Sequence, residues 1–266
     1  MSIPLTPVLR EEYERLFETC DIRPERARGV EQAAERLIEH RDRYREVGER
    51  QGVPWVFVGL VHQMETSGDF GRHLHNGDPL TDRTVHVPVG RPRRGSPPFR
   101  WEDSAVDALA MKRLNRHSDW SLAGQLYQFE KYNGWGYRRF HPEVLSPYLW
   151  SFSTHYDRGK YVSDGRWSDT AVARQPGAAV ILRRLAELGE AAFPEQHRRG
   201  PVTPLVPRYS MRRPSQAESL SRVEALQRWL NTFPSLFVGV DGVPGPRTSE
   251  AYRLATGHYL PGDPRA

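Results

Sequence analysis

The sequence predicts a mainly α-helical protein with a small β-hairpin region and a separate, smaller C-terminal domain. Apolar residues recur at helical spacing over residues 8–50, with a break at "CDIRPERARG", which indicates two amphipathic helices. The segment "WVFVGLVHQMET" is apolar on nearly every side and follows Pro54, which suits the first turn of a helix. It predicts a central helix that ends near Gly68.

Residues 69–100 are rich in turn residues and β-branched residues. The turn "HNGDPL", the apolar "RTVHVPV" and the loop "GRPRRGSPP" predict a short strand in a hairpin region. Two further helices are expected from Asp103 to Asn115 and from Ser118 to Lys131, because each begins with an acceptable N-cap residue. The segment "YNGWGYRRFHP" interrupts the helical pattern, and a last helix is expected around "GAAVILRRLAELGEAAF".

The domain organisation follows from length and composition. A chain of 266 residues can form one sizeable core and a smaller module. Residues 1–195 are expected to form the larger, catalytic domain, with N-terminal helices over 8–50 and a core over 54–193. Residues 196–214, rich in Pro and Arg, predict a semi-rigid linker. Residues 215–262 are expected to form a small binding domain.

Composition narrows the partners and the compartment. A net charge of +5 favours an anionic partner. The basic segments accompany no recognised nucleic-acid reader, and no apolar stretch approaches the ~18 residues that cross a bilayer, so neither nucleic acid nor membrane is expected as a partner. The N-terminal residues lack a secretory signal and Cys20 is the single cysteine, so synthesis in a reducing cytoplasm is expected. We expect a monomer without cofactor or metal.

Glu65 is the main candidate for catalysis. On a helix it lies on the same face as Val58 and Val61, so apolar neighbours disfavour its charged form. It also occupies the last helical turn, where the negative end of the helix dipole disfavours an anion. Both effects raise the pKa of the carboxyl group, which suits a general acid that must hold a proton near neutral pH.

Cleavage of a glycosidic bond uses such an acid together with a second group across the cleft. Asp78 and Asp82 are the candidates for a second carboxylate, since both follow the predicted helix within the turn-rich segment. Asp78 precedes Pro79, and an acceptor that stabilises an Asx-turn is the alternative interpretation.

Two motifs resemble a known superfamily. "GLVHQMETSGDF" resembles the helix and acid motif of the lysozyme-like superfamily, and "FEKYNGWGYRRF" is similar to the Tyr-Asn-Gly motif of goose-type lysozymes and soluble lytic transglycosylases. The resemblance covers residues 50 to 160, roughly. It implies a lysozyme-like α+β domain in which Glu65 is the general acid, Asp78 matches a goose-type aspartate, and Tyr132 and Asn133 shape the sugar cleft.

Other residues are expected beside that cleft: Trp135, Thr84, His86 and His62. The chain departs from the goose-type pattern after the acid, where "RTVHVPVGRP" replaces the usual Gly-Leu-Met-Gln stretch. This departure leaves both hydrolysis and lytic transglycosylation open.

The C-terminal region resembles a peptidoglycan-binding domain of the three-helix type. The pattern is carried by Val223, Leu226, Gln227, Leu230, Asp241, Gly242, Gly245 and Thr248. Gly242 and Gly245 are expected to adopt positive φ in a turn, and Thr248 to cap a helix. Trp229 and Tyr252 are the aromatic candidates for contact with the wall polymer, with a place in the core as the alternative.

Together the two resemblances predict an endolysin-like, bacteriolytic muramidase that cleaves the bond between N-acetylmuramic acid and N-acetylglucosamine. Such a chain would act on the cell wall after release from the cytoplasm or export without a Sec signal. An alternative is a zinc-dependent amidase or peptidase that uses the cluster of His62, His73, His75 and His86. A wall-binding protein without activity is the third hypothesis, because fold does not imply function.

Overall fold

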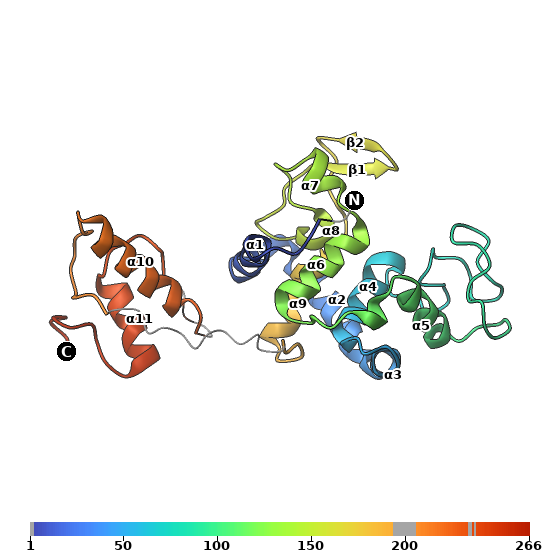
Figure 1. The fold of residues 1–266 in the computed structure, drawn as a ribbon, viewed down its shortest axis with the longest axis horizontal. Helices are drawn as coiled ribbons and strands as arrows, with labels where there is room; N and C mark the ends of the chain where they lie inside the picture. Colours follow the sequence, from blue (N-terminus) through green and yellow to red (C-terminus); the bar gives the residue numbers. More distant parts are fainter. Residues whose placement is uncertain (1–2, 194–205, 234–235, 237) are drawn as a thin grey trace. The chain divides into compact units, whose positions relative to one another are not determined.

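The computed structural model describes residues 3–193, 206–233, 236 and 238–266. The chain divides into two compact units, Met1–Pro194 and Glu195–Ala266, and the described parts of both are mainly helical (Figure 1). Among the described residues, no helix is long and apolar enough to cross a membrane.

The N-terminal part of the first unit forms three α-helices, where the sequence predicted two. They are α1 (Pro7–Glu18), α2 (Ala27–Glu39) and α3 (Arg41–Gln51). The Thr6 side chain caps α1 by accepting a hydrogen bond from the Leu9 N–H. The predicted second helix divides because the backbone leaves helical geometry at His40, which ends α2 and begins α3.

Helix α4 (Trp55–Thr66) is the central helix, as predicted, and every residue from Val56 to Met64 is buried. Pro54 lies one position earlier than expected, at the N-cap. The helix ends because Ser67 and Gly68 both adopt left-handed backbone conformations, with φ of 55° and 75°.

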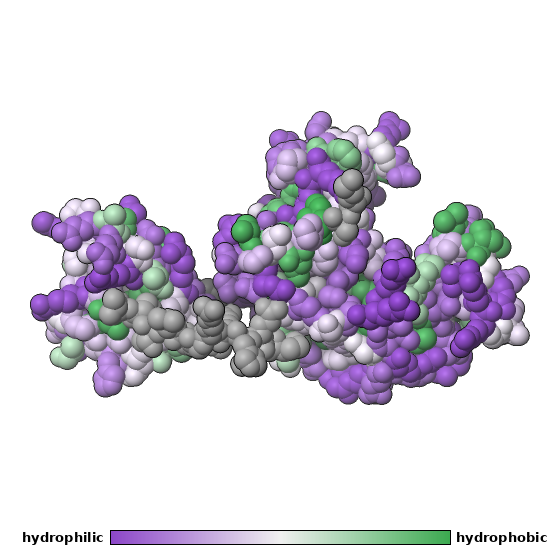
Figure 2. Space-filling view, viewed as in Figure 1, coloured by the Kyte–Doolittle hydropathy of each residue, from purple (hydrophilic) through white to green (hydrophobic). Residues whose placement is uncertain are grey.

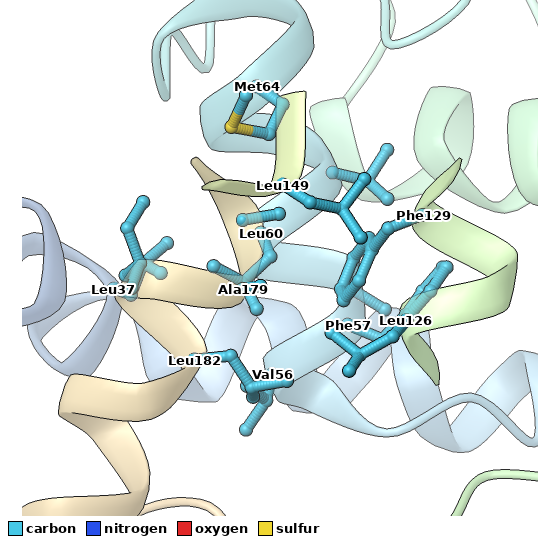
Figure 3. Packing of buried hydrophobic residues seen from close by; sticks show 14 of the residues in the cluster. Leu37, Val56, Phe57, Leu60, Met64, Leu126, Phe129, Leu149, Ala179 and Leu182 are labelled. Atoms are coloured by element: carbon cyan, nitrogen blue, oxygen red, sulfur yellow. The ribbon is translucent and has the colours of Figure 1, made fainter. Parts of the chain in front are cut away.

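The core of the first unit surrounds α4 (Figure 3). The Phe57 ring of α4 stacks on the Phe129 ring with 4.4 Å between centroids. At Gly59 a Cβ atom would lie 3.1 Å from side-chain carbons of Leu37 and Tyr44, so the missing side chain permits close packing of α2 and α3.

The remaining helices of the first unit carry or support the polar residues discussed below. They are α5 (Trp101–Met111), α6 (Leu122–Asn133), α7 (Gly136–Phe140), α8 (Pro147–Trp150) and α9 (Ala178–Glu187), with short 3-10 turns η1 (Pro24–Arg26) and η2 (Leu114–Arg116). Ser121 caps α6 by accepting a hydrogen bond from the Gly124 N–H. Helix α6 runs on to Asn133, so the Tyr-Asn-Gly segment begins inside a helix and the chain leaves it at Gly134, with φ of 98°.

The prediction of a strand within residues 69–100 is wrong, because that segment forms only an isolated bridge between Arg72 and Pro79. The N–H groups of Val85 and His86 donate to a side chain, and prolines offer no N–H, so the segment lacks donors for a ladder. The antiparallel hairpin lies instead at β1 (Lys160–Ser163) and β2 (Arg166–Ser168).

The described part of the second unit forms α10 (Ala217–Leu230) and α11 (Pro246–Thr256) around a small core. That core consists of Leu226, Leu230, Ala251 and Leu260. The residues predicted for the linker lie partly outside the described residues, and 206–214 contain neither helix nor strand.

Gln227 stabilises the turn between α10 and α11 through hydrogen bonds of its side chain. Its Nε2 donates to Asp241 Oδ1 (2.7 Å), while its Oε1 accepts from the Gly242 N–H (2.9 Å). Gly242 has positive φ as predicted, but Gly245 does not, since its φ is −91°. Thr248 lies inside α11 and does not cap it; its hydroxyl donates to the Val243 carbonyl.

Candidate active site

Glu65 occupies the last turn of α4, and its carboxyl group has one direct protein partner. The Tyr148 hydroxyl, on α8, donates a hydrogen bond to Glu65 Oε1 over 2.9 Å. Within the described part of the chain, no hydrogen bond or ion pair engages the other oxygen, Oε2. One carboxyl oxygen is therefore oriented, and the other is free to hold or deliver a proton.

Tyr132 and Lys112 complete the surroundings of this carboxyl group. Lys112 Nζ, just after α5, lies 4.6 Å from the centroid of the Tyr132 ring at the end of α6. The charge of Glu65 raises the pKa of both Tyr132 and Tyr148, after burial as the larger cause. Both hydroxyls therefore stay protonated at neutral pH and remain hydrogen-bond donors.

The environment of Glu65 raises the pKa of its carboxyl group. The largest cause is loss of solvation, and the hydrogen bond from Tyr148 and the charge of Lys112 act in the opposite direction. Yet the residue as a whole is exposed to solvent. These observations agree if protein surrounds the carboxyl group on most sides while one side stays open to water. Such an environment suits an acid that must hold a proton and meet a large substrate.

Local packing fixes these positions. Asn133 Nδ2 donates to Ser146 Oγ over 3.3 Å, which ties the end of α6 to the residue before α8. A Cβ atom on Gly177 would lie 2.2 Å from the Leu149 carbonyl oxygen, so only glycine lets the start of α9 lie against α8. The position of Tyr148 therefore depends on segments that are distant in sequence.

Sequence reasoning missed Tyr148 and Lys112. The only available signal for Tyr148 was "SPYLW", in which a serine and a proline can begin a short helix. Nothing in the local pattern of Lys112 distinguishes it from other surface lysines. Both were identifiable only through their non-local neighbours, Glu65 and Tyr132.

Asp78 organises its own loop. Its carboxylate accepts four hydrogen bonds, from Asn76 Nδ2, the N–H groups of Val85 and His86, and His86 Nδ1. These bonds hold its pKa far below the usual range. Because all four hydrogen bonds come from residues 76–86 of its own loop, the structure favours the interpretation of Asp78 as a turn acceptor.

The neighbouring candidates have similar local roles. The exposed Asp82 accepts a hydrogen bond from the Arg83 N–H. Thr84 is buried and bonds across its loop to the Arg91 N–H and the Pro88 carbonyl. His86 is exposed, with its ring held by Asp78. None of these side chains is joined to Glu65 by a hydrogen bond among the described residues.

The histidines do not form one cluster. His62 is fully buried, its Nδ1 bonds to the Tyr44 hydroxyl, and burial lowers its pKa to about 4. His73 bonds to Ser104 and to the Asp82 carbonyl, and His75 bonds to Asp107. No group of three potential ligands that could hold a metal ion occurs among the described residues. The alternative of a zinc site therefore lacks its cluster of ligands among the described residues, and His62, expected beside the cleft, is instead a core residue.

The aromatic candidates are partly buried. Trp135 packs against Tyr127, with 5.2 Å between ring centroids. Trp229 and Tyr252 pack against the small core of the second unit, and Trp229 also contacts Phe233 edge to face. Each keeps partial exposure, so a contact with ligand and a place in the core are compatible for all three.

A second acid with a raised pKa lies beside a hollow of about 400 Å³. This acid, Glu130, is 3% exposed, and its Oε2 accepts hydrogen bonds from Tyr13 and from Arg138 Nε. Arg138 also pairs with Glu12 over 3.0 Å. Glu130 is buried and ion-paired, which indicates a structural role. Glu65 is accessible to solvent and is therefore the better candidate for a catalytic acid.

In comparisons with known proteins, no family model, no curated protein and no solved structure matches this chain.

Proposed function

We propose that this protein cleaves the glycan strands of bacterial peptidoglycan, with a lysozyme-like first unit and a peptidoglycan-binding second unit. The observation that carries the proposal is the meeting of Glu65 with the Tyr-Asn-Gly segment. Glu65, whose own pKa is raised, lies near enough to Tyr132 for its charge to raise the pKa of that hydroxyl, although the two residues are far apart in sequence. A protonated acid beside tyrosine side chains is suited to protonate a glycosidic oxygen.

In the proposed reaction, Glu65 Oε2 gives its proton to the glycosidic oxygen between N-acetylmuramic acid and N-acetylglucosamine. The bond from that oxygen to the anomeric carbon breaks, its electron pair stays with the oxygen, and the leaving sugar departs as an alcohol. A hydroxyl oxygen then attacks the anomeric carbon and returns its proton to Glu65. Tyr148 orients the carboxyl group through Oε1.

The attacking oxygen distinguishes two versions of this function. Water gives a muramidase, whereas the muramyl 6-hydroxyl gives a lytic transglycosylase. The muramidase version with a second carboxylate assigns that role to Asp78 or Asp82. The four hydrogen bonds that occupy Asp78 within its own loop favour the transglycosylase as second candidate, because that reaction needs one carboxyl group only.

The second unit is proposed to bind the wall polymer. The bonds of Gln227 hold a rigid turn beside α11. Partly exposed Trp229 and Tyr252 offer aromatic faces that can stack on sugars. Linking such a module to a catalytic unit raises the local concentration of substrate.

The decisive experiment compares Glu65→Gln with wild type on purified sacculi. Loss of the acid is expected to lower the rate by ~10²–10⁴-fold. Glu49→Gln is the matched control, because Glu49 is an exposed glutamate on α3. Mass spectrometry of the products separates the versions, since reducing ends mean hydrolysis and 1,6-anhydro ends mean transglycosylation. Full activity of Glu65→Gln would refute the proposal.

A further inference from the structure

Three valines project into solvent from the loop between α4 and α5. Val85, Val87 and Val89 are 67%, 86% and 68% exposed. They alternate along the segment 84–91, which we call the valine loop. Figure 2 shows hydrophobic surface on the loop region next to α5, with hydrophilic surface beside it.

Hydrogen bonds close the valine loop at its base. The Thr84 N–H donates to the Arg91 carbonyl (2.8 Å), the Arg91 N–H donates to Thr84 Oγ1 (2.9 Å), and the Gly90 N–H donates to the Thr84 carbonyl (2.8 Å). Asp78 takes the N–H groups of Val85 and His86. These five N–H groups therefore bond within the protein, and the apolar side chains are held outward in a defined conformation.

Arginines dominate the chain from this loop onward. Residues 83–100 contain five arginines and no acidic residue. Arg91 pairs with Asp107, Arg100 pairs with Glu46, and Arg83 donates to the Gly95 carbonyl. Arg93 and Arg94 are exposed, and no ion pair or hydrogen bond engages either side chain within the described residues. Unpaired cations thus lie directly after an apolar projection.

We propose that the valine loop inserts into the surface of an anionic lipid membrane, while Arg93 and Arg94 contact lipid phosphates. Burial of exposed valine side chains in the acyl boundary is favourable, and cations near an anionic surface add electrostatic attraction. No membrane partner was expected from the sequence, because no apolar stretch is long enough to span a bilayer. Peripheral insertion of a loop needs none.

Charge and size favour lipid over a second copy of the chain. Two copies facing each other through this loop would bring the unpaired Arg93 and Arg94 of both into proximity, which is repulsive. Three valines also bury far less than the ~1,600 Å² of a standard protein interface. A projecting apolar tip instead buries its whole surface when it enters an apolar medium.

The first test is co-sedimentation of the full chain with vesicles of phosphatidylglycerol and phosphatidylcholine, against vesicles of phosphatidylcholine alone. Wild type is expected to bind the anionic vesicles and to lose binding with salt. The combined Val85→Thr, Val87→Thr and Val89→Thr variant keeps β-branched shapes and should partition about tenfold more weakly. Arg93→Gln with Arg94→Gln should weaken binding roughly thirtyfold.

Val162→Thr with Val172→Thr is the matched control, because these valines are 50% and 47% exposed and lie outside the loop. It should bind as wild type does. Circular dichroism establishes that each variant is folded. Failure of wild type to bind anionic vesicles, or unchanged binding by the triple variant, would overturn the proposal. So would a wild-type dimer that becomes monomeric in the triple variant, since the loop would then be a self-association surface.

A second measurement reports insertion directly. Val87→Cys, labelled with an environment-sensitive dye, should show a blue shift with anionic vesicles, while labelled Val162→Cys should not. Cys20, the single native cysteine, is buried and is not expected to compete for the label. Sedimentation without a blue shift at residue 87 would mean electrostatic adsorption only and would overturn insertion.

Discussion

Replacing Tyr148 by phenylalanine removes the direct hydrogen bond to Glu65 and keeps the ring. The bond from the Tyr148 hydroxyl to Glu65 Oε1 is 2.9 Å long and lowers the pKa of Glu65. The variant should therefore have a Glu65 with a higher pKa. A general acid works when protonated, so activity falls as pH rises through its pKa. The descending limb of the pH–rate profile should consequently move to higher pH.

The size of this movement follows from the energy of the bond. A hydrogen bond to a charged group contributes ~1.5–3 kcal/mol, and 1.36 kcal/mol corresponds to about one pH unit. Two facts reduce the effect. Water reaches the exposed Glu65 and replaces part of the bond. Tyr148 can also donate to the protonated acid, so only the difference between the two states counts. We expect a movement of roughly 0.5–1 pH unit.

The assay measures the initial rate of release of soluble fragments from dye-labelled sacculi between pH 4 and pH 9, approximately, at constant ionic strength. Tyr132→Phe is the matched control, because the Tyr132 ring lies beside Lys112 but no hydrogen bond joins its hydroxyl to Glu65 among the described residues. It can change the rate through substrate contacts but should leave the limb in place. A Tyr148→Phe limb that coincides with wild type, or moves to lower pH, would refute the reasoning.

Other predictions concern stability. Burial lowers the pKa of His62 from 6.5 to about 4, so the unfolded chain binds more protons in that window and stability should fall by up to about 3 kcal/mol as pH drops through it. His62→Gln keeps a partner for Tyr44, and its urea unfolding should lack this pH dependence. Asp78→Asn should speed proteolytic cleavage within residues 76–91, because a carboxylate that accepts four hydrogen bonds is lost. An unchanged cleavage rate would show that these bonds do not stabilise the loop. Gln227→Met should destabilise the second unit by ~1–3 kcal/mol, measured calorimetrically, while cleavage of soluble glycan oligomers stays unchanged.

Local signals explain why the helices were largely predictable. The apolar run of α4, with glycine after its end, has few alternative structures. The place of Glu65 in the last turn of that helix was therefore predictable. Predictions failed where a side chain replaced a backbone partner. Asp78 takes two N–H groups that a strand would have used, and the pattern of "RTVHVPV" does not reveal this. The hairpin at β1 and β2 was missed, although Asp164 and Gly165 between its strands are a known turn signal.

The roles of histidines show the same limit. His62, His73, His75 and His86 lie close together in sequence, and a shared zinc site was the alternative interpretation of them. In the folded chain each bonds to a different neighbour, and the partner of His62 is the Tyr44 hydroxyl. Sequence spacing indicates which ligands are available, but the directions of their side chains depend on helices that pack from elsewhere in the chain.

The sequence by itself determined the helical character of both units, the end of α4 at which Glu65 lies, and the basic charge of the chain, because each depends on residue types within a short window. The tertiary structure decided that Tyr148 bonds to Glu65, 83 positions away, and that the valines of the valine loop project into solvent. The pKa of a carboxyl group depends on lost solvation and on nearby donors and charges, and folding brings these together from distant segments.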